Sequence, residues 1–335
     1  MSGPHRYLVV GAGSIGRRHI ANLRRLFPTA RIDCVTASGR QVDPAWVGAD
    51  TVLVDIAEAA QFQPRFAIIA SPAPHHAEQA ALLLEKGVPT LIEKPLSASM
   101  ETLAPFRVTL ETHRNYIGVG YNLRLLGSAQ TMKSILEEGR IGRVHSVNAE
   151  VGQYLPDWRP ESNYRLNVSA QRHLGGGALL ELSHELDYLA WLFGPAETVY
   201  CFARNTGTLD IDVEDLVVAI LTGPTIPAIS VQLDFLQRAP ARLCKVVGEH
   251  GTLVWDVLAN RVTLLGPAGA SEVLFDQPGA DRNHMYLDEL VRFDAALSSG
   301  LVPQVSLDEA IIVMRQVDAL RRSAASGAAV TIDRE

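Results

Sequence analysis

The first third of the chain alternates short apolar runs with stretches of helical periodicity. Apolar runs at residues 7–10, 32–36, 51–54, 66–70, 90–92 and 116–120 predict strands, and helical periodicity predicts helices over 14–27, 75–86 and 99–113. Strands that alternate with helices at this spacing form βαβ units around a buried parallel sheet. We therefore expect a doubly wound α/β domain over residues 1–120.

The pattern changes beyond residue 120. A predicted helix over 128–138 leads into β-rich runs at 144–151, 198–204, 216–221, 226–236, 243–247, 252–257 and 261–265, with one helix at 178–192 among them. Consecutive strands without helices between them indicate a mostly antiparallel sheet, so residues 121–335 are expected to form an α+β domain. Two helices, 283–298 and 307–325, close the chain and could pack back on the first domain. Ser306 and Glu309 form a capping box before the second of them.

Composition agrees with two globular domains and narrows the class of partner. The chain has 335 residues, of which 47% are hydrophobic, and 30 basic against 37 acidic side chains give a net charge of −7. No basic field attracts nucleic acid or an anionic membrane, so a small molecule is the expected partner. Cys34, Cys201 and Cys244 form no C-x-x-C, and no signal peptide or membrane-length apolar run is present. We expect a cytoplasmic protein without a metal site.

The strongest motif is Gly11-Ala12-Gly13-Ser14-Ile15-Gly16, which follows a predicted strand and opens a predicted helix. In that setting Gly11 permits a tight turn, Gly13 lets a pyrophosphate approach the backbone, and Gly16 allows the helix to pack closely on the strand. The helix N-terminus, including Ser14 and Ile15, offers free N–H groups to phosphates. The motif predicts a Rossmann dinucleotide site.

The end of the second strand bears on the choice between NAD and NADP. An acidic residue there would bind the ribose 2′-hydroxyl and repel a 2′-phosphate, but Ala37 stands near that position. Ser38 and Arg40 can donate to a phosphate, so the sequence favours NADP over NAD. The alternative is that Arg40 is a solvated loop residue and that Asp33 or Asp43 takes the acidic role.

A lysine stands where ligands bind in such folds. Glu93-Lys94-Pro95 directly follows the strand at 90–92, and Pro95 keeps Lys94 extended so that its side chain projects. A lysine at this edge can hydrogen-bond a substrate oxygen and stabilise the negative charge that develops on it during hydride transfer.

Together these motifs resemble the Gfo/Idh/MocA oxidoreductases. The resemblance rests on the glycine motif, the segment from Ser71-Pro72 to His76, the Glu-Lys-Pro triplet, and Gly175 to Leu180 followed by a histidine, and it extends over nearly the whole chain. It implies a Rossmann domain, an open-faced α+β domain, a nicotinamide cofactor and a reaction at a carbinol carbon of a sugar or cyclitol. It also implies a homodimer or homotetramer assembled through the exposed sheet face.

The resemblance implies roles for individual residues. Lys94 matches the family's catalytic lysine, and His184 its histidine that transfers a proton to or from the reacting oxygen. The family commonly has an aspartate four residues before this histidine; here Glu181 lies three before it and Asp187 three after. Because residues three apart on a helix share a face, Glu181 could orient His184 or contact the substrate, and Asp187 is the alternative. The alternative for His184 is a buried structural histidine. Further cofactor contacts are expected at Ser71, Pro72, His76, Glu93 and Asn122, and a substrate contact at Arg124.

The segment 153–173 is rich in aromatic and arginine side chains. Aromatic faces stack on sugar rings and arginines bind carboxylates or phosphates, so Tyr154, Trp158, Arg159, Tyr164 and Arg165 are candidate substrate contacts. Packing or subunit contact is an equal alternative. The sequence thus predicts an NADP-preferring oxidoreductase acting on a sugar derivative. Its alternatives are a non-catalytic nucleotide sensor and a reductase of C=N or C=C bonds.

Overall fold

The computed structural model describes residues 5–36 and 39–333. The chain divides into two compact units. The first comprises Met1–Asn122 and Asn283–Met314, and the second Leu123–Arg282 and Arg315–Glu335. The helix predicted at 283–298 therefore belongs to the same unit as the N-terminal domain.

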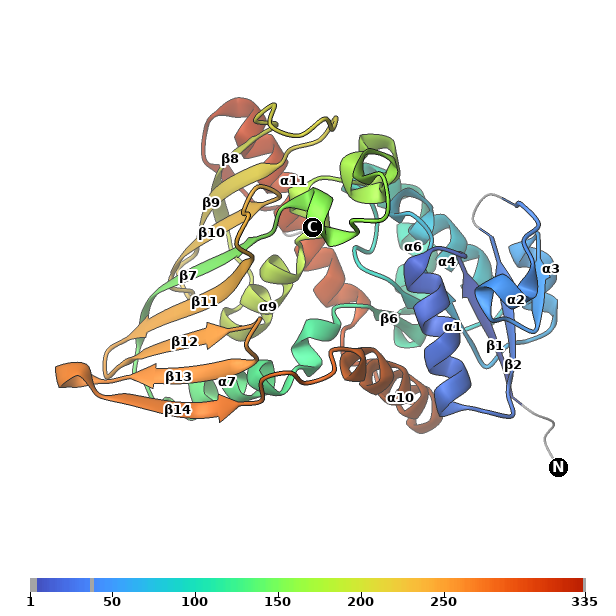
Figure 1. Ribbon diagram of the computed structural model, residues 1–335, viewed down its shortest axis with the longest axis horizontal. Helices are drawn as coiled ribbons and strands as arrows, with labels where there is room; N and C mark the ends of the chain where they lie inside the picture. Colours follow the sequence, from blue (N-terminus) through green and yellow to red (C-terminus); the bar gives the residue numbers. More distant parts are fainter. Residues whose placement is uncertain (1–4, 37–38, 334–335) are drawn as a thin grey trace. The chain divides into compact units, whose positions relative to one another are not determined.

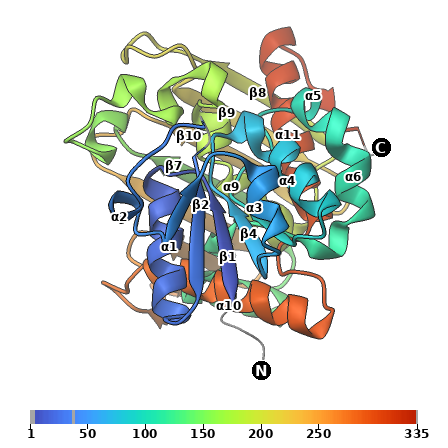
Figure 2. The same ribbon diagram turned by 90° about the vertical axis from the view of Figure 1, so that its right-hand side faces the viewer.

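The first unit is built on a six-stranded parallel sheet with the strand order β3-β2-β1-β4-β5-β6. Figure 2 shows β2, β1 and β4 side by side, as their pairing requires. The order reverses between β1 and β4, and ligands bind beyond the carboxyl ends of the strands at such a switch point. The strands are β1 (Arg6–Val10), β2 (Arg31–Val35), β3 (Thr51–Leu53), β4 (Phe66–Ile69), β5 (Thr90–Ile92) and β6 (Ile117–Val119).

Helices cover this sheet, and its core is apolar. Tyr7, Phe66 and Phe293 are almost fully buried, and the rings of Phe66 and Phe293 meet edge-on at 5.2 Å. The helix predicted over 99–113 is interrupted by a 3-10 turn at Ala104–Phe106, because Pro105 has no N–H for the helical ladder. The helices are α1 (Ser14–Leu26), α2 (Pro44–Val47), α3 (Ile56–Gln61), α4 (His76–Glu85), α5 (Met100–Leu103), α6 (Arg107–Thr112) and α10 (Asn283–Ser299).

The second unit is built on a nine-stranded sheet with the order β14-β13-β12-β11-β7-β10-β9-β8-β15. Neighbouring strands are antiparallel except for β7 and β10, which run parallel. β14 and the two-residue β15 were not predicted. The strands are β7 (Val144–Gly152), β8 (Thr198–Arg204), β9 (Leu216–Thr222), β10 (Ala228–Asp234), β11 (Ala241–Gly248), β12 (Thr252–Asp256), β13 (Arg261–Leu265), β14 (Ser271–Asp276) and β15 (Val330–Thr331).

One face of the large sheet is covered by helices. α7 (Gly127–Glu137) packs on β12 to β14 and α9 (His184–Phe193) on β7, and Figure 1 shows both beside the sheet. On β8 and β9, buried and exposed side chains alternate, and the exposed ones pair across the strands, Tyr200 with Ile220 and Phe202 with Val218. This part of the sheet therefore presents an apolar surface, as an open-faced sheet predicts.

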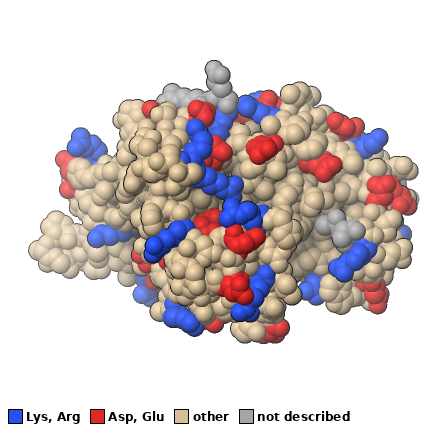
Figure 3. All heavy atoms as spheres, turned by 90° about the horizontal axis from the view of Figure 1, so that it is seen from above, with Lys and Arg blue, Asp and Glu red and all other residues tan. Residues whose placement is uncertain are grey.

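The long helix α11 (Leu307–Ser326) begins at the predicted capping box. The Ser306 hydroxyl accepts the Glu309 N–H at 3.3 Å, and the Glu309 carboxylate accepts the Ser306 N–H at 2.9 Å. Among the helices within 5–36 and 39–333, none combines the length and apolar character of a membrane span. On the face drawn in Figure 3, basic and acidic side chains are interspersed.

Candidate active site

The glycine motif has the local geometry that each of its glycines was expected to provide. Gly11 has φ +115°, and a Cβ there would lie 2.5 Å from the Ala70 carbonyl oxygen; a Cβ at Gly16 would lie 1.9 Å from the carbonyl oxygen of Gly11. Both positions therefore exclude a side chain. By contrast, apart from Gly13 itself and its two chain neighbours, no described residue has an atom within 4 Å of a Cβ built at Gly13. Gly13 borders open space at the end of β1.

The helix that follows begins without a competing side chain. Gly13 is the N-cap of α1, and neither it nor the first-turn residues Ser14 and Ile15 supply a carboxylate. The N–H groups of this turn and the positive end of the helix dipole therefore remain available to an anion. Together with the open side of Gly13, this arrangement can bind a pyrophosphate.

The end of β2 carries no acidic side chain among the residues that are described. Asp33 lies within the strand, almost fully buried, and pairs with Arg6 and Arg31. Asp43 caps α2 by accepting the Ala45 N–H at 2.9 Å. Both alternatives to Ala37 therefore have other roles. Thr36 donates its hydroxyl to the Arg40 carbonyl at 2.6 Å, whereas Ala37 and Ser38 lie outside the described residues.

The segment after β4 is fixed by a buried histidine. The ring of His76 lies between two carbonyl oxygens, that of Pro95 at 2.8 Å from Nδ1 and that of Ser71 at 2.7 Å from Nε2. Burial lowers the pKa of His76. Its position gives His76 a bracing role: it joins the Ser71-Pro72 turn to the chain around Lys94. The cofactor contact that the family resemblance implies for His76 stays a prediction.

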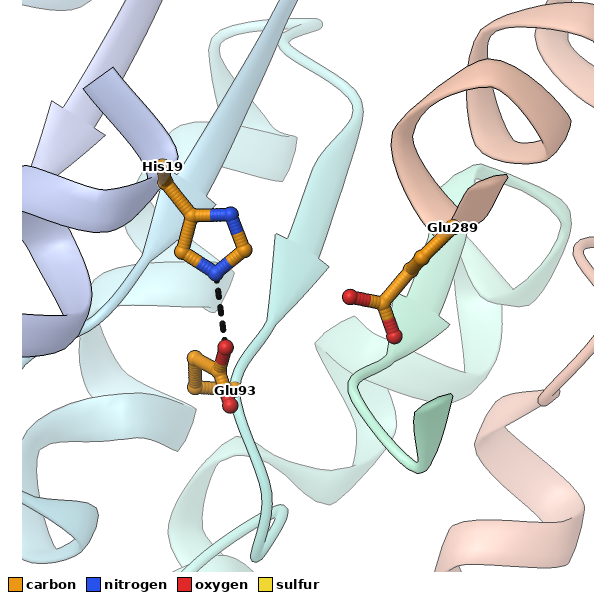
Figure 4. Close-up of side chains that lie close together, drawn as sticks. All are labelled: His19, Glu93 and Glu289. Atoms are coloured by element: carbon orange, nitrogen blue, oxygen red, sulfur yellow. Dashed lines mark hydrogen bonds and ion pairs between the residues drawn. The ribbon is translucent and has the colours of Figure 1, made fainter. Parts of the chain in front are cut away.

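The segment after β5 places Lys94 between buried neighbours. Glu93 and Pro95 are buried, Lys94 is partly exposed, and the Lys94–Pro95 peptide bond is cis. Glu93 Oε1 contacts Nε2 of the buried His19 at 2.6 Å, as Figure 4 shows, and Glu93 Oε2 accepts the Lys94 N–H at 3.3 Å. Burial raises the pKa of Glu93, but the hydrogen bond and attraction from His19 outweigh it and hold the pKa below its usual value. Glu93 is thus a buried carboxylate that holds Lys94 in place.

Asn122, the last residue of the first stretch of this unit, is also buried. Its side chain hydrogen-bonds Tyr286 of α10. Burial raises the pKa of Tyr286, so its phenol stays protonated at neutral pH. Asn122 therefore connects the end of β6 to α10, and the structure adds Tyr286 to its surroundings.

In the second unit, the helix predicted over 178–192 is two helices. α8 (Ala178–Glu181) ends at Glu181, and α9 begins at His184. Because the helix breaks between them, the expectation that Glu181 and His184 share a helical face is wrong. The Glu181 carboxylate accepts the Ser169 hydroxyl at 3.0 Å, while His184 is partly exposed at the start of α9.

Two ion pairs fix α9. Arg124 binds Asp187 through both ends of its guanidinium, at 2.9 and 2.6 Å, and the two side chains are 2% and 0% exposed. Arg242 binds Glu185 in the same way at 2.7 and 3.0 Å. Buried charges in this geometry are fully paired. The guanidinium of Arg124 thus positions the helix that carries His184, and because it is buried against Asp187 it is not the substrate contact that was expected.

In the segment 153–173, several residues that were predicted to contact substrate instead contact other side chains of the second unit. Arg165 pairs with Asp210 at 2.7 Å and stacks over Tyr164. Two aromatic rings also have partners, since Tyr154 lies under the guanidinium of Arg238 and Trp158 packs edge-on against Phe235 at 5.3 Å. Arg159 is exposed and forms no ion pair with the described residues. Packing thus accounts for most of this segment and leaves Arg159 as its candidate for an anionic group.

Comparison with known families agrees with both units. Residues 5–121 match the oxidoreductase family with an NAD-binding Rossmann fold, and residues 129–254 match the GFO/IDH/MocA C-terminal domain. The chain belongs to the Gfo/Idh/MocA family. The expected fold, a Rossmann domain followed by an α+β domain with a large open sheet, is confirmed, and the first domain is an NAD-binding domain.

Named relatives include dehydrogenases of sugars and cyclitols. An inositol 2-dehydrogenase of Streptomyces avermitilis is 29% identical over 58% of this chain and 55% of its own length. A D-xylose 1-dehydrogenase (NADP(+)) of Haloferax volcanii is 26% identical over 77% of each chain. An uncharacterized oxidoreductase of Synechocystis matches over only 35% of its length. The chain therefore matches only about half of the inositol 2-dehydrogenase and about a third of the Synechocystis oxidoreductase.

Solved structures share the whole fold. Levoglucosan dehydrogenase, in a complex with NADH and levoglucosan, superposes with a TM-score of 0.84 at 19% identity, covering 99% of this chain and 100% of that one. The WlbA dehydrogenase from Bordetella pertussis, in a complex with NADH and UDP-GlcNAcA, gives 0.82 at 21% identity, covering 100% and 99%. At these identities the likeness shows the fold alone.

Three buried or close-packed side chains near the predicted residues, two in the first unit and one in the second, had no signal in the sequence. His19 and Glu289 meet Glu93 only through tertiary packing, and Figure 4 shows the carboxyl of Glu289 turned toward the other two side chains. Glu214 accepts the Leu179 N–H at 3.1 Å, and a Cβ at Gly177, where φ is +107°, would lie 2.4 Å from its carboxylate. Gly177, the last glycine of the run before His184, is therefore needed for close packing on Glu214.

Proposed function

We propose that this protein is an NADP-preferring oxidoreductase that moves a hydride between the nicotinamide and a secondary alcohol or ketone of a sugar, sugar acid, nucleotide sugar or cyclitol. The observation that carries the proposal is the pairing, on one sheet, of an open glycine turn at Gly13 with a partly exposed lysine, Lys94, after β5. The first can bind a dinucleotide, and the second can act on a substrate oxygen at the same carboxyl edge.

In the proposed mechanism the nicotinamide, when bound, accepts or supplies the hydride. The Lys94 ammonium hydrogen-bonds the reacting oxygen and stabilises the negative charge that develops on it. The His184 imidazole takes the hydroxyl proton during oxidation and returns it during reduction, because imidazole titrates near neutral pH. Glu93 and His76 hold the backbone around Lys94, and Asp187 with Arg124 holds the helix of His184.

The NADP preference rests on the loop after β2. Asp33 and Asp43, the two acidic residues considered for the 2′-hydroxyl, are engaged elsewhere, and Arg40 is exposed after the strand. Substituting Arg40→Ala should weaken NADPH binding about 10-fold or more and leave NADH binding nearly unchanged. Fluorescence titration of both nucleotides measures this, with Arg25→Ala as an exposed-arginine control. Tighter binding of NADH than of NADPH by the unaltered protein would refute the preference.

The sugar-like substrate class is supported by relatives whose names specify inositol and D-xylose. The exposed Arg159 adds a group that can bind a carboxylate or phosphate on the substrate. A panel of sugars, cyclitols, sugar acids and nucleotide sugars, tested with either cofactor, measures this through the absorbance of reduced nicotinamide. Tight nucleotide binding without turnover of any member would favour a nucleotide sensor, and turnover of imines or enones alone would favour the C=N or C=C reductase.

We also propose a homodimer or homotetramer formed through the apolar strip of Tyr200, Phe202, Val218 and Ile220. These four side chains are 50%, 49%, 43% and 43% exposed, and such a contiguous apolar surface is typical of an interface. Ile220→Lys should convert the assembly to a monomer in light scattering, whereas an unchanged mass would contradict this interface.

We also propose a cytoplasmic location. The buried thiols Cys34, Cys201 and Cys244 form no disulfide, which fits a reducing compartment.

A further inference from the structure

Three buried side chains, His19, Glu93 and Glu289, form a cluster in the first unit. They come from α1, the end of β5 and α10, and one ligand-type atom from each lies within 4.8 Å of the others. Figure 4 shows all three pointing toward one another. Two carboxyl groups at this distance cannot both be charged in a dry interior unless a cation lies between them or one of them holds a proton.

The geometry favours a proton over a metal ion. Zinc binds imidazole and carboxylate at about 2.1 Å, which places two ligand atoms of a tetrahedral site about 3.4 Å apart. His19 Nε2 and Glu93 Oε1 are only 2.6 Å apart, the distance of a strong hydrogen bond. The other oxygen of Glu93 accepts the Lys94 N–H. Glu93 is thus already satisfied as a carboxylate without a metal ion.

Glu289, unlike Glu93, has a carboxyl oxygen that the described residues do not satisfy with a hydrogen bond. Its residue is 8% exposed, and Oε2 has no hydrogen-bond partner among the described residues. An unpartnered carboxylate in such a place costs far more free energy than an unpartnered carboxylic acid. Burial and the charge of Glu93 both raise the pKa of Glu289 well above its usual value. The charged or titratable groups that surround the pair are His19 and Arg18 on α1, His76 on α4, Lys94 after β5, and Tyr286 on α10.

The cluster acts on Lys94 through the backbone. Glu93 holds the Lys94 N–H, and a Cβ at Gly120 would lie 3.1 Å from Glu93 Oε2, so β6 closes tightly over the same carboxylate. We propose that His19 and Glu289 are positioning residues for Lys94: His19 fixes Glu93 by donating to its carboxylate, and Glu289 opposes Glu93 as a neutral, protonated acid. The part that concerns Lys94 rests on the proposed function; the protonation of Glu289 does not.

The first test asks whether the hydrogen-bond donor of His19 matters, rather than only the space that its side chain fills. Gln can place its amide N–H near the position of Nε2, so His19→Gln keeps a donor to Glu93, whereas His19→Leu removes it and keeps an apolar side chain of similar size. With a sugar that the wild type oxidises, H19L should lower kcat about 10- to 100-fold with the KM for NADP changed less than about 3-fold, and H19Q should restore most of kcat. Equal loss in both variants, or full activity in H19L, would overturn the role of His19.

The second test needs no turnover. A carboxyl whose folded-state pKa is raised contributes stability that is complete below its unfolded value, 4.5, and is lost as the pH rises toward the folded value. The melting temperature of the wild-type chain should therefore fall relative to that of Glu289→Gln as pH is raised from about 5 to about 8. Asp288→Asn, which alters the exposed neighbouring acid on the same helix, should follow the wild type.

Each outcome distinguishes the proposals. Parallel melting curves for the wild type and E289Q would overturn the protonated Glu289. So would one equivalent of zinc that copurifies with the wild type and is absent from E289Q, measured by elemental analysis. If the wild type oxidises no sugar, the proposed function fails, while the melting curves still decide the state of Glu289.

Discussion

A Cβ would fit at Gly13 but not at Gly16, so alanine substitutions at the two positions should have different effects on stability and on cofactor binding. Gly13 has φ −70°, which alanine adopts without strain, and open space surrounds its missing Cβ. Gly13→Ala should therefore leave the melting temperature of the cofactor-free protein unchanged or slightly raised, because alanine restricts the unfolded chain and adds about 0.5 kcal/mol of stability. The added methyl group would, however, occupy space into which a pyrophosphate must approach.

The expected loss of affinity follows from the hydrogen bonds at the helix N-terminus. A hydrogen bond from a backbone N–H to a charged oxygen contributes about 2 kcal/mol, so displacing the pyrophosphate from one such group should weaken NADPH binding about 30-fold. Gly16→Ala is the matched variant: its Cβ would lie 1.9 Å from the Gly11 carbonyl oxygen, so the fold itself should lose roughly 3 kcal/mol. Calorimetry of the apo protein and fluorescence titration of NADPH measure the two effects. Wild-type affinity in G13A would refute the assignment of the phosphate site.

Two further predictions concern the second unit. Arg124→Met should destabilise the second unit by about 3–5 kcal/mol in urea unfolding, because the substitution leaves the buried Asp187 charge unpaired. Combining R124M with Asp187→Leu should recover most of that loss. A small effect of R124M alone would show that Arg124 is not needed to hold α9. Arg165→Ala, which removes a solvent-exposed pair with Asp210, should change stability by less than about 1 kcal/mol, and a loss as large as that of R124M would contradict this description of segment 153–173.

The sequence predicted the parts of the fold that depend on local pattern. Gly11 and Gly16 stand where the structure leaves no room for a side chain, and the strand-helix alternation predicted the parallel sheet. The predicted helix boundaries were wrong where a helix is interrupted inside a continuous helical pattern. Pro105 interrupts one predicted helix, and a break after Glu181 separates it from His184 in another. The apolar periodicity continues across both breaks and gives no sign of them.

Side chains whose role depends on a distant partner could not be assigned from the sequence. Arg124 is 63 residues from Asp187, and His19 is 74 residues from Glu93. An arginine at a predicted domain junction is equally consistent with substrate binding and with a buried ion pair. Only the fold shows that Asp187 lies beside it. The position of Lys94 directly after a strand was predicted from its sequence neighbours, and the structure adds the histidines that hold those neighbours.

The most direct test of the proposed activity compares two lysines of the first unit. Lys94→Ala and Lys86→Ala each remove one ammonium group, but Lys86 is an exposed residue at the end of α4. With a sugar substrate and NADP, formation of reduced nicotinamide should fall about 10³-fold in K94A and remain at the wild-type rate in K86A, with NADPH affinity nearly unchanged in both. Wild-type turnover by K94A would contradict the account.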